Sequence, residues 1–140
     1  MPKEFWFNLP VKDVQKSKAF FLAIGFAFNE PRSTGNDMVC MLAGEKKTVI
    51  MLIEEKMFAG FSQNNLPDTS LGSELLISYD AENREEVDII AQKVIAAGGN
   101  LFSKPAEHQG WMYGCAFADP DGHRWNVVFM DQSELPKLKK

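Results

Sequence analysis

Basic residues, histidine and cysteine are scarce in this sequence. Among 140 residues there are 15 Lys and Arg against 19 Asp and Glu, with two His and two Cys. The basic residues are scattered except in the C-terminal run 137–140 (KLKK), whereas nucleic-acid-binding surfaces gather them in a face or stripe. We therefore expect no nucleic-acid partner, and a small molecule is the better default ligand.

Long hydrophobic runs are also missing. No apolar stretch reaches the roughly 18 residues that a membrane span needs. Residues 1–6 (MPKEFW) lack the apolar core and the cleavage site of a secretory signal. Cys40 and Cys115 lie in apolar, strand-like runs, which indicates buried thiols in a reducing compartment. The sequence thus predicts a cytoplasmic protein without a membrane partner.

Apolar residues are plentiful, and their periodicity predicts one order of elements twice. Hydrophobic residues make up 45% of the chain, enough for one core without disulfides. The expected elements of the first half are a strand at 5–11, a helix from Asp13 to about Ile24, and strands at 26–29, 37–43 and 48–54. Those of the second half are a strand at 74–79, a helix capped by Asn83 and Glu86 and ended by Gly98-Gly99, and strands at 101–104, 111–117 and 124–130.

This order predicts an α+β fold. Two βαβββ modules would form a cupped mixed sheet with the helices on its outer face. The expected organisation is a single domain with module one at 1–55, a linker at 56–72, module two at 73–132 and a basic tail at 133–140. A linker of this length in a small chain often acts as a lid or crossover.

Period-two alternation assigns the side chains of each strand to one of two faces. After the predicted Asp121-Gly122 hairpin turn, the last strand alternates between Trp125, Val127 and Phe129 on one face and Arg124, Asn126 and Val128 on the other. The same rule gives the helix-free face this set: Trp6, Asn8, Val49, Met51, Ile53, Glu74, Leu76, Ser78, Arg124, Asn126 and Val128. The two faces remain interchangeable at this stage, because several strands are apolar on both sides.

Three stretches carry a resemblance to a known family. They are residues 8–13 (NLPVKD), 17–26 (SKAFFLAIGF) and 119–123 (DPDGH). In this order, and with the doubled βαβββ pattern, the chain resembles the vicinal-oxygen-chelate superfamily from end to end. That superfamily holds glyoxalase I, extradiol dioxygenases, fosfomycin-resistance enzymes and bleomycin-resistance proteins. The small glyoxalase/bleomycin-resistance-like proteins are the most similar, and they imply an open cup and a homodimer.

The resemblance also implies where a metal would bind. In the superfamily's metalloenzymes, the first and last strands of each module supply the ligands, and these positions fall on Trp6, Met51, Glu74 and Asn126. Trp cannot bind a metal, a thioether prefers soft metals, and Asn offers only a neutral oxygen. Glu74 alone remains of a site that needs three or four ligands. We therefore expect no metal and no cofactor.

The leading hypothesis is a metal-free protein that binds a small molecule in an aromatic-lined cup, as bleomycin-resistance proteins do. The residues expected to line the cup are Trp6, Asn8, Met51, Glu74, Trp111, Tyr113, Arg124 and Asn126, with Phe58 and Phe61 as further aromatic candidates. The acidic net charge favours a cationic or amphipathic ligand.

Two alternatives stay open. One is a metal-dependent lyase or dioxygenase with an altered metal site, in which Glu74 would be the catalytic base. The other is a structural dimer whose vestigial cup is filled by side chains. His108 and His123 lie in polar or turn segments and have no recognisable ligand spacing.

Overall fold

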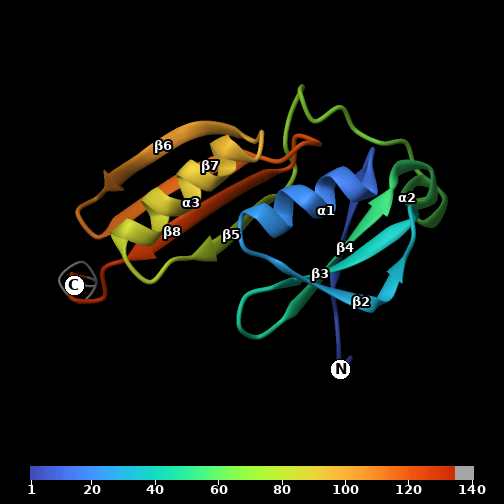
Figure 1. Cartoon of the computed structure of the whole chain (residues 1–140), viewed down its shortest axis with the longest axis horizontal. Helices are drawn as coiled ribbons and strands as arrows, with labels where there is room; N and C mark the ends of the chain where they lie inside the picture. The colour runs from blue at the N-terminus through green and yellow to red at the C-terminus, as the bar shows by residue number, and fades with distance from the viewer. Residues whose placement is uncertain (135–140) are drawn as a thin grey trace. The chain divides into compact units, whose positions relative to one another are not determined.

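Two units with the same order of elements make up the chain (Figure 1). The computed structural model describes residues 1–134, so all but the first two residues of the predicted basic tail lie outside the described part. The first unit comprises residues 1–71 and the second unit residues 72–140. Within residues 1–134, every helix is too short or too polar to cross a membrane.

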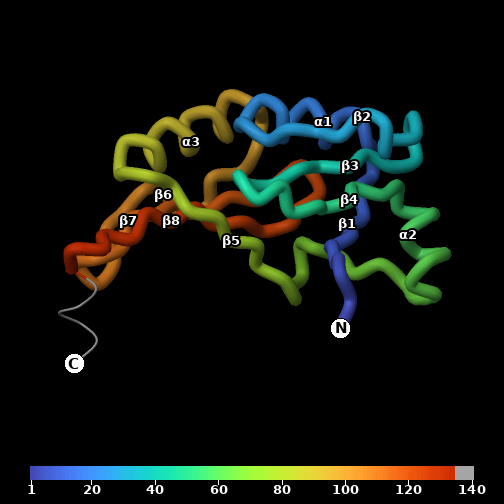
Figure 2. Tube along the Cα trace, turned by 90° about the horizontal axis from the view of Figure 1, so that it is seen from below, coloured from blue at the N-terminus to red at the C-terminus, as the bar shows by residue number. Residues whose placement is uncertain are grey.

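The first unit contains four strands and two helices. Its elements are β1 (Phe7–Val11), α1 (Val14–Ala23), β2 (Ala27–Thr34), β3 (Met38–Ala43), β4 (Thr48–Glu54) and α2 (Glu55–Ser62). The strands lie in the order β1-β4-β3-β2, and β1 runs parallel to β4 while the other neighbours are antiparallel. Helix α1 packs on β2, β3 and β4, whereas α2 contacts β1 and β4 (Figure 2).

The second unit repeats this topology. Its elements are β5 (Leu76–Asp80), α3 (Arg84–Ala96), β6 (Asn100–His108), β7 (Met112–Ala118) and β8 (Arg124–Met130). The strand order β5-β8-β7-β6 matches that of the first unit, with a parallel pair followed by two antiparallel pairs. The predicted α+β class and the doubled βαβββ order are confirmed.

The helix ends follow from local hydrogen bonding. The Asp13 carboxylate accepts a hydrogen bond from the backbone N–H of Lys16 at 3.1 Å and so starts α1. The Asn83 side chain accepts one from the N–H of Glu86 at 2.8 Å and starts α3 in the same way. Both predicted caps are confirmed. Gly25, at φ 109°, ends α1 because glycine adopts this left-handed conformation without strain.

Each sheet buries the face that its helix covers. In the first unit, Leu52 and Phe21 are fully buried between β4 and α1. In the second unit, Val87 and Val94 of α3 are fully buried, and the rings of Phe117 and Trp125 stack at a centroid distance of 6.1 Å. Because side chains alternate along a strand, this settles the open assignment of faces in favour of the predicted one.

Several predicted boundaries were wrong. Strands β1 and β5 each start two residues later than predicted, so Trp6 and Glu74 precede the strands instead of lying in them. Strands β2 and β6 are longer than predicted, and both contain register shifts that interrupt the regular alternation. Residues 56–72 were predicted to be a linker, but residues 55–62 form helix α2. The sequence did not indicate helix α2, because the helix has only eight residues and none of them is buried.

Candidate functional site

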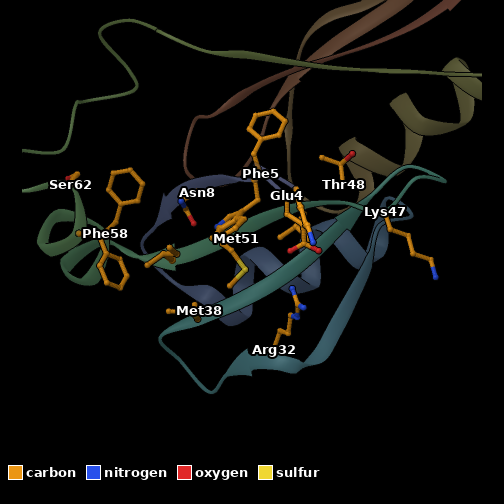
Figure 3. A pocket seen from close by; sticks show the side chains of 15 residues that line it. Glu4, Phe5, Asn8, Arg32, Met38, Lys47, Thr48, Met51, Phe58 and Ser62 are labelled. Atoms are coloured by element: carbon orange, nitrogen blue, oxygen red, sulfur yellow. The ribbon is translucent and has the colours of Figure 1, made fainter. Parts of the chain in front are cut away.

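A pocket of about 920 Å³ lies in the first unit (Figure 3). It opens on the face of the sheet opposite α1, because the strand residues that line it alternate with those buried against α1. On β4, Ile50 and Leu52 face the helix, and Met51 and Ile53 therefore face the pocket. The full lining is Lys3, Glu4, Phe5, Trp6, Asn8, Arg32, Met38, Lys47, Thr48, Val49, Met51, Ile53, Phe58, Phe61 and Ser62.

One end of the pocket is aromatic. Phe58 and Phe61 of α2 form it, and Trp6, half-exposed just before β1, also lines the pocket. Helix α2 begins immediately after β4, where the carboxylate of Glu54 accepts a hydrogen bond from the N–H of Lys56 at 2.8 Å. This cap turns the chain at the end of the strand and so brings the α2 aromatics to the pocket.

The opposite part of the pocket is charged and depends on two irregular backbone segments. Arg32 lies where the β2 register shifts between Asn29 and Thr34. There the Ser33 hydroxyl donates to the carbonyl of Asn29 at 3.0 Å and accepts from the N–H of Cys40 at 3.2 Å. A bulge of this kind redirects a side chain away from the regular alternation.

Lys47 occupies the second irregular segment, the β3–β4 turn. Its backbone has a left-handed φ of 56°, and its N–H donates to the carbonyl of Gly44 at 3.0 Å. The predicted hairpin turn at 44–47 is therefore present, and it places a lysine at the pocket edge.

Three of the predicted ligand-binding residues come together in this pocket. Asn8 and Met51 are register partners on the neighbouring strands β1 and β4, and Trp6 precedes β1. The cationic residues Lys3, Arg32 and Lys47 were missed. No sequence signal marks Arg32, because its position depends on a bulge in an edge strand.

Asn126 lines a different, smaller pocket, within the second unit. This pocket has a volume of about 200 Å³ and also includes Ser103 and His108. The Oδ1 atom of Asn126 is buried and has no hydrogen-bond partner among residues 1–134. Gly114 borders the same pocket, and a Cβ there would lie 2.5 Å from the carbonyl oxygen of Val127, so the close strand contact requires glycine.

The other four predicted site residues line neither pocket. Glu74 is exposed and precedes β5. The guanidinium of Arg124 stacks over the Phe102 ring at 4.2 Å. The other two are Trp111 and Tyr113.

These two aromatic residues have partners elsewhere in the second unit. The Trp111 indole N–H donates to the side-chain oxygen of Gln109 at 3.3 Å. The Tyr113 hydroxyl donates to the Asp88 carboxylate at 2.6 Å, so this ring faces α3. Tyr113 follows the alternation of β7, on which Cys115 and Phe117 are buried toward the helix.

The donor atoms at the positions where the resemblance implies metal ligands do not fit a metal ion. Trp6 supplies no ligand, Met51 supplies a thioether, and Glu74 supplies the single carboxylate. Within residues 1–134, no three His, Cys, Asp or Glu side chains are grouped so that they could hold a metal.

Comparisons with known proteins agree with the fold. The family model described as bleomycin resistance protein-like N-terminal matches residues 4–44. The solved structure of a hypothetical protein from S. aureus is 39% identical, with a TM-score of 0.82, and the match covers 92% of this chain and 95% of that one. No curated protein matches the sequence.

Two further solved structures share the fold at lower identity. A glyoxalase/bleomycin resistance protein/dioxygenase family enzyme from Burkholderia phytofirmans PsJN is 20% identical, with a TM-score of 0.75 and coverage of 89% of this chain and 96% of that one. A fosfomycin resistance protein from Listeria monocytogenes is also 20% identical, with a TM-score of 0.67 and coverage of 96% and 98%.

Proposed function

We propose that the chain is a member of the vicinal-oxygen-chelate superfamily of glyoxalases, bleomycin-resistance proteins and dioxygenases, and that it binds a small hydrophobic or aromatic molecule without a metal ion. The observation that carries this proposal is the pocket of about 920 Å³ in the first unit. Small-molecule sites are typically clefts of about 300–1,000 Å³ with mostly apolar walls and a few polar groups. Trp6, Met51 and Phe58 supply such walls, and Asn8 is one of the polar groups.

The donor chemistry favours binding over metal-dependent catalysis. A lyase or dioxygenase of this superfamily would need several N or O ligands at positions that hold Trp6, Met51 and Asn126. Glu74 as a catalytic base would need to reach the ligand, and it does not line the first-unit pocket. A vestigial cup would be filled by side chains, and the volume of the pocket argues against that alternative. Sequestration of the ligand, the role of bleomycin-resistance proteins, therefore suits this chain best.

We further propose that the protein is a cytoplasmic homodimer. Strands β1 and β5 lie at sheet edges and leave one side of each strand unpaired within its own sheet. Their exposed apolar residues include Phe7 and Leu76. Pairing of copies would cover such edges. The two free, buried cysteines support a reducing compartment.

A ligand screen tests the binding proposal. Compounds with aromatic or aliphatic bodies are ranked by the shift in Tm that they cause, and the affinity of the best is measured by calorimetry. Trp6→Ala and Phe58→Ala should each weaken binding by about 2 kcal/mol, which is roughly 30-fold, because each removes an aromatic wall. Phe102→Ala is the matched control, since Phe102 is an exposed ring of the second unit. Equal affinity in all three variants would exclude the first-unit pocket as the site.

Elemental analysis tests the metal-free part. The protein is purified untagged and without chelator, offered Zn, Ni, Mn and Fe in turn, and washed. We expect much less than one metal ion per chain. Near-stoichiometric metal that is lost in Glu74→Ala would instead support the lyase or dioxygenase alternative.

A further inference from the structure

The charges that line the first-unit pocket differ in sign from the charge of the whole chain. The chain has a formal net charge of −4. The pocket lining has three cationic side chains, Lys3, Arg32 and Lys47, and one carboxylate, Glu4. A ligand in this pocket therefore meets a local excess of positive charge on an acidic protein.

The cations of the pocket are available to a ligand. Arg32, Lys47 and Lys3 take part in no ion pair within residues 1–134, whereas Arg84 in the second unit is paired with Glu107 and Asp131. The charge of Arg32 also affects the Cys40 thiol of strand β3. Burial raises the pKa of the Cys40 thiol, and the Arg32 guanidinium partly offsets that rise.

The apolar and cationic parts of the pocket are separated along β4. Figure 3 shows Phe58 and Lys47 at opposite ends of the pocket, with Met51 between them. Lys47 precedes β4 and α2 follows it, so the backbone between them spans about 20 Å of extended strand. Arg32 lies closer to the middle, because its charge acts on Cys40, the register partner of Met51.

We propose that the ligand is an amphipathic organic anion whose apolar body packs against Trp6, Met51 and Phe58 and whose negative group faces Arg32. This inference rests on the proposed function and adds the chemical class of the ligand. A planar guanidinium can form two charge-assisted hydrogen bonds to a carboxylate or phosphate. Glu4 disfavours a second negative group on its side of the pocket. The net charge of the chain predicts a cationic or amphipathic ligand, and the charges of the pocket lining favour the amphipathic class with a negative group.

Three probes that share one ring system and differ in charge test the inference. They are 1-naphthaleneacetate, 1-naphthaleneacetamide and 1-naphthylmethylammonium, titrated by calorimetry into the full chain at low ionic strength. We expect the anion to bind about tenfold more tightly than the neutral amide, and the cation to bind most weakly. Salt at 0.5 M should reduce the advantage of the anion, because it screens charge.

Substitution of Arg32 separates its role from that of the apolar walls. Arg32→Met keeps an apolar stem and removes the charge, so it should weaken binding of the acetate about tenfold and leave the amide within about twofold. Arg84→Met is the control, because it makes the same change of net charge in the second unit. Trp6→Ala should weaken binding of the acetate and the amide together.

The outcomes distinguish the inference from the proposed function. If the amide binds as tightly as the acetate, and Arg32→Met changes neither, the anion inference is wrong and the binding proposal stands. If the ammonium probe binds more tightly than the acetate, the anion inference is likewise wrong and the binding proposal stands. If no probe binds, or Trp6→Ala leaves the binding of every probe unchanged, the proposed function fails and the inference fails with it.

Discussion

A single buried carboxylate organises the β7–β8 turn. Asp119 is 6% exposed, and its Oδ1 accepts backbone hydrogen bonds from the N–H groups of Asp121 at 2.9 Å and His123 at 3.0 Å. Its Oδ2 accepts one from the indole N–H of Trp125 at 3.1 Å. The sequence predicts the turn from Asp121-Gly122. It does not predict this role of Asp119, because all three donors come within reach only once the turn has formed.

Asp119→Ala should lower the free energy of unfolding by about 3 kcal/mol, because it leaves one buried donor, the Trp125 indole N–H, and two part-buried backbone N–H groups without an acceptor. Asp119→Asn should lower the free energy of unfolding by clearly less than Asp119→Ala does. Burial raises the pKa of Asp119 above its ordinary value despite the nearby His123 and the hydrogen bonds, so burial itself opposes the charged form. The asparagine oxygen can still accept from the N–H groups of Asp121 and His123, while only the Trp125 indole N–H loses its acceptor. Urea unfolding followed by tryptophan fluorescence measures both variants. Equal stability of the alanine and asparagine variants would contradict the role of the carboxylate as an acceptor.

The two thiols should be unreactive in the native protein. Burial raises the pKa of Cys115 to about 11, helped by the negative charge of Asp88, and burial also raises the pKa of Cys40. At pH 8 the thiolate, the reactive form, is therefore a very small fraction of Cys115 and the minor form of Cys40.

Ellman's reagent should thus titrate no thiol in the native protein at pH 8 and two per chain after unfolding in guanidinium. If one thiol does react in the native protein, the Cys40→Ala and Cys115→Ala variants identify which one. Rapid labelling of Cys40 alone in the native protein would mean that the first-unit sheet opens at the pocket, and it would contradict this prediction.

Among secondary-structure elements, interior strands were easier to predict than edge strands. Strands β4 and β8 have the predicted bounds to the residue, and both lie inside their sheets. All four edge strands differ from prediction by two or more residues at an end. An interior strand has neighbours on both sides and is held in regular alternation, whereas an edge strand tolerates bulges and a proline such as Pro105 in β6.

The same contrast explains how much of the candidate site was predictable. Asn8 and Met51 follow from alternation on β1 and β4, and Phe58 was among the aromatic candidates. Arg32 and Lys47 depend on a bulge and a left-handed turn residue, which have no periodic signal. The residues on regular strands could therefore be predicted from the sequence. The charged residues Arg32 and Lys47 could be found only in the structure.

Helix α3 provides a test at the level of the element. Asn83→Ala removes the side chain that accepts from the N–H of Glu86, and it should lower the free energy of unfolding by about 1 kcal/mol. Asn83→Asp and Asn83→Ser retain an acceptor and should stay within about 0.5 kcal/mol of the native protein. Thermal and urea unfolding measure all three. An alanine variant as stable as the aspartate variant would show that the cap contributes nothing.

At the scale of the whole molecule, the fold resembles that of known metalloenzymes, but the metal-binding side chains of those enzymes are mostly missing. The doubled βαβββ topology is the fold of solved structures titled glyoxalase/bleomycin resistance protein/dioxygenase, but the positions at which the resemblance implies metal ligands hold mostly residues that are poor ligands. The charge of the whole chain likewise does not predict the charge of the pocket, since an acidic chain has a pocket lined by an excess of cationic side chains. Function therefore has to be argued from the site, because a shared fold supports many chemistries.

Assembly is the remaining property of the whole molecule, and the exposed edge strands predict it. Phe7 on β1 is 43% exposed and Leu76 on β5 is 54% exposed, and charged residues at such positions oppose edge pairing. Light scattering coupled to gel filtration should give about twice the chain mass of 15.8 kDa for the native protein.

Phe7→Lys or Leu76→Lys should shift the protein toward monomer at micromolar concentration, because a charge at a closely packed interface is costly. Leu22→Lys is the control, since Leu22 is 51% exposed on α1, which packs on β2, β3 and β4 of the first unit. Circular dichroism establishes that each variant is folded before its mass is interpreted. A native protein that stays monomeric at all concentrations would exclude the dimer. Dissociation caused by Leu22→Lys alone would move the interface to the helix face.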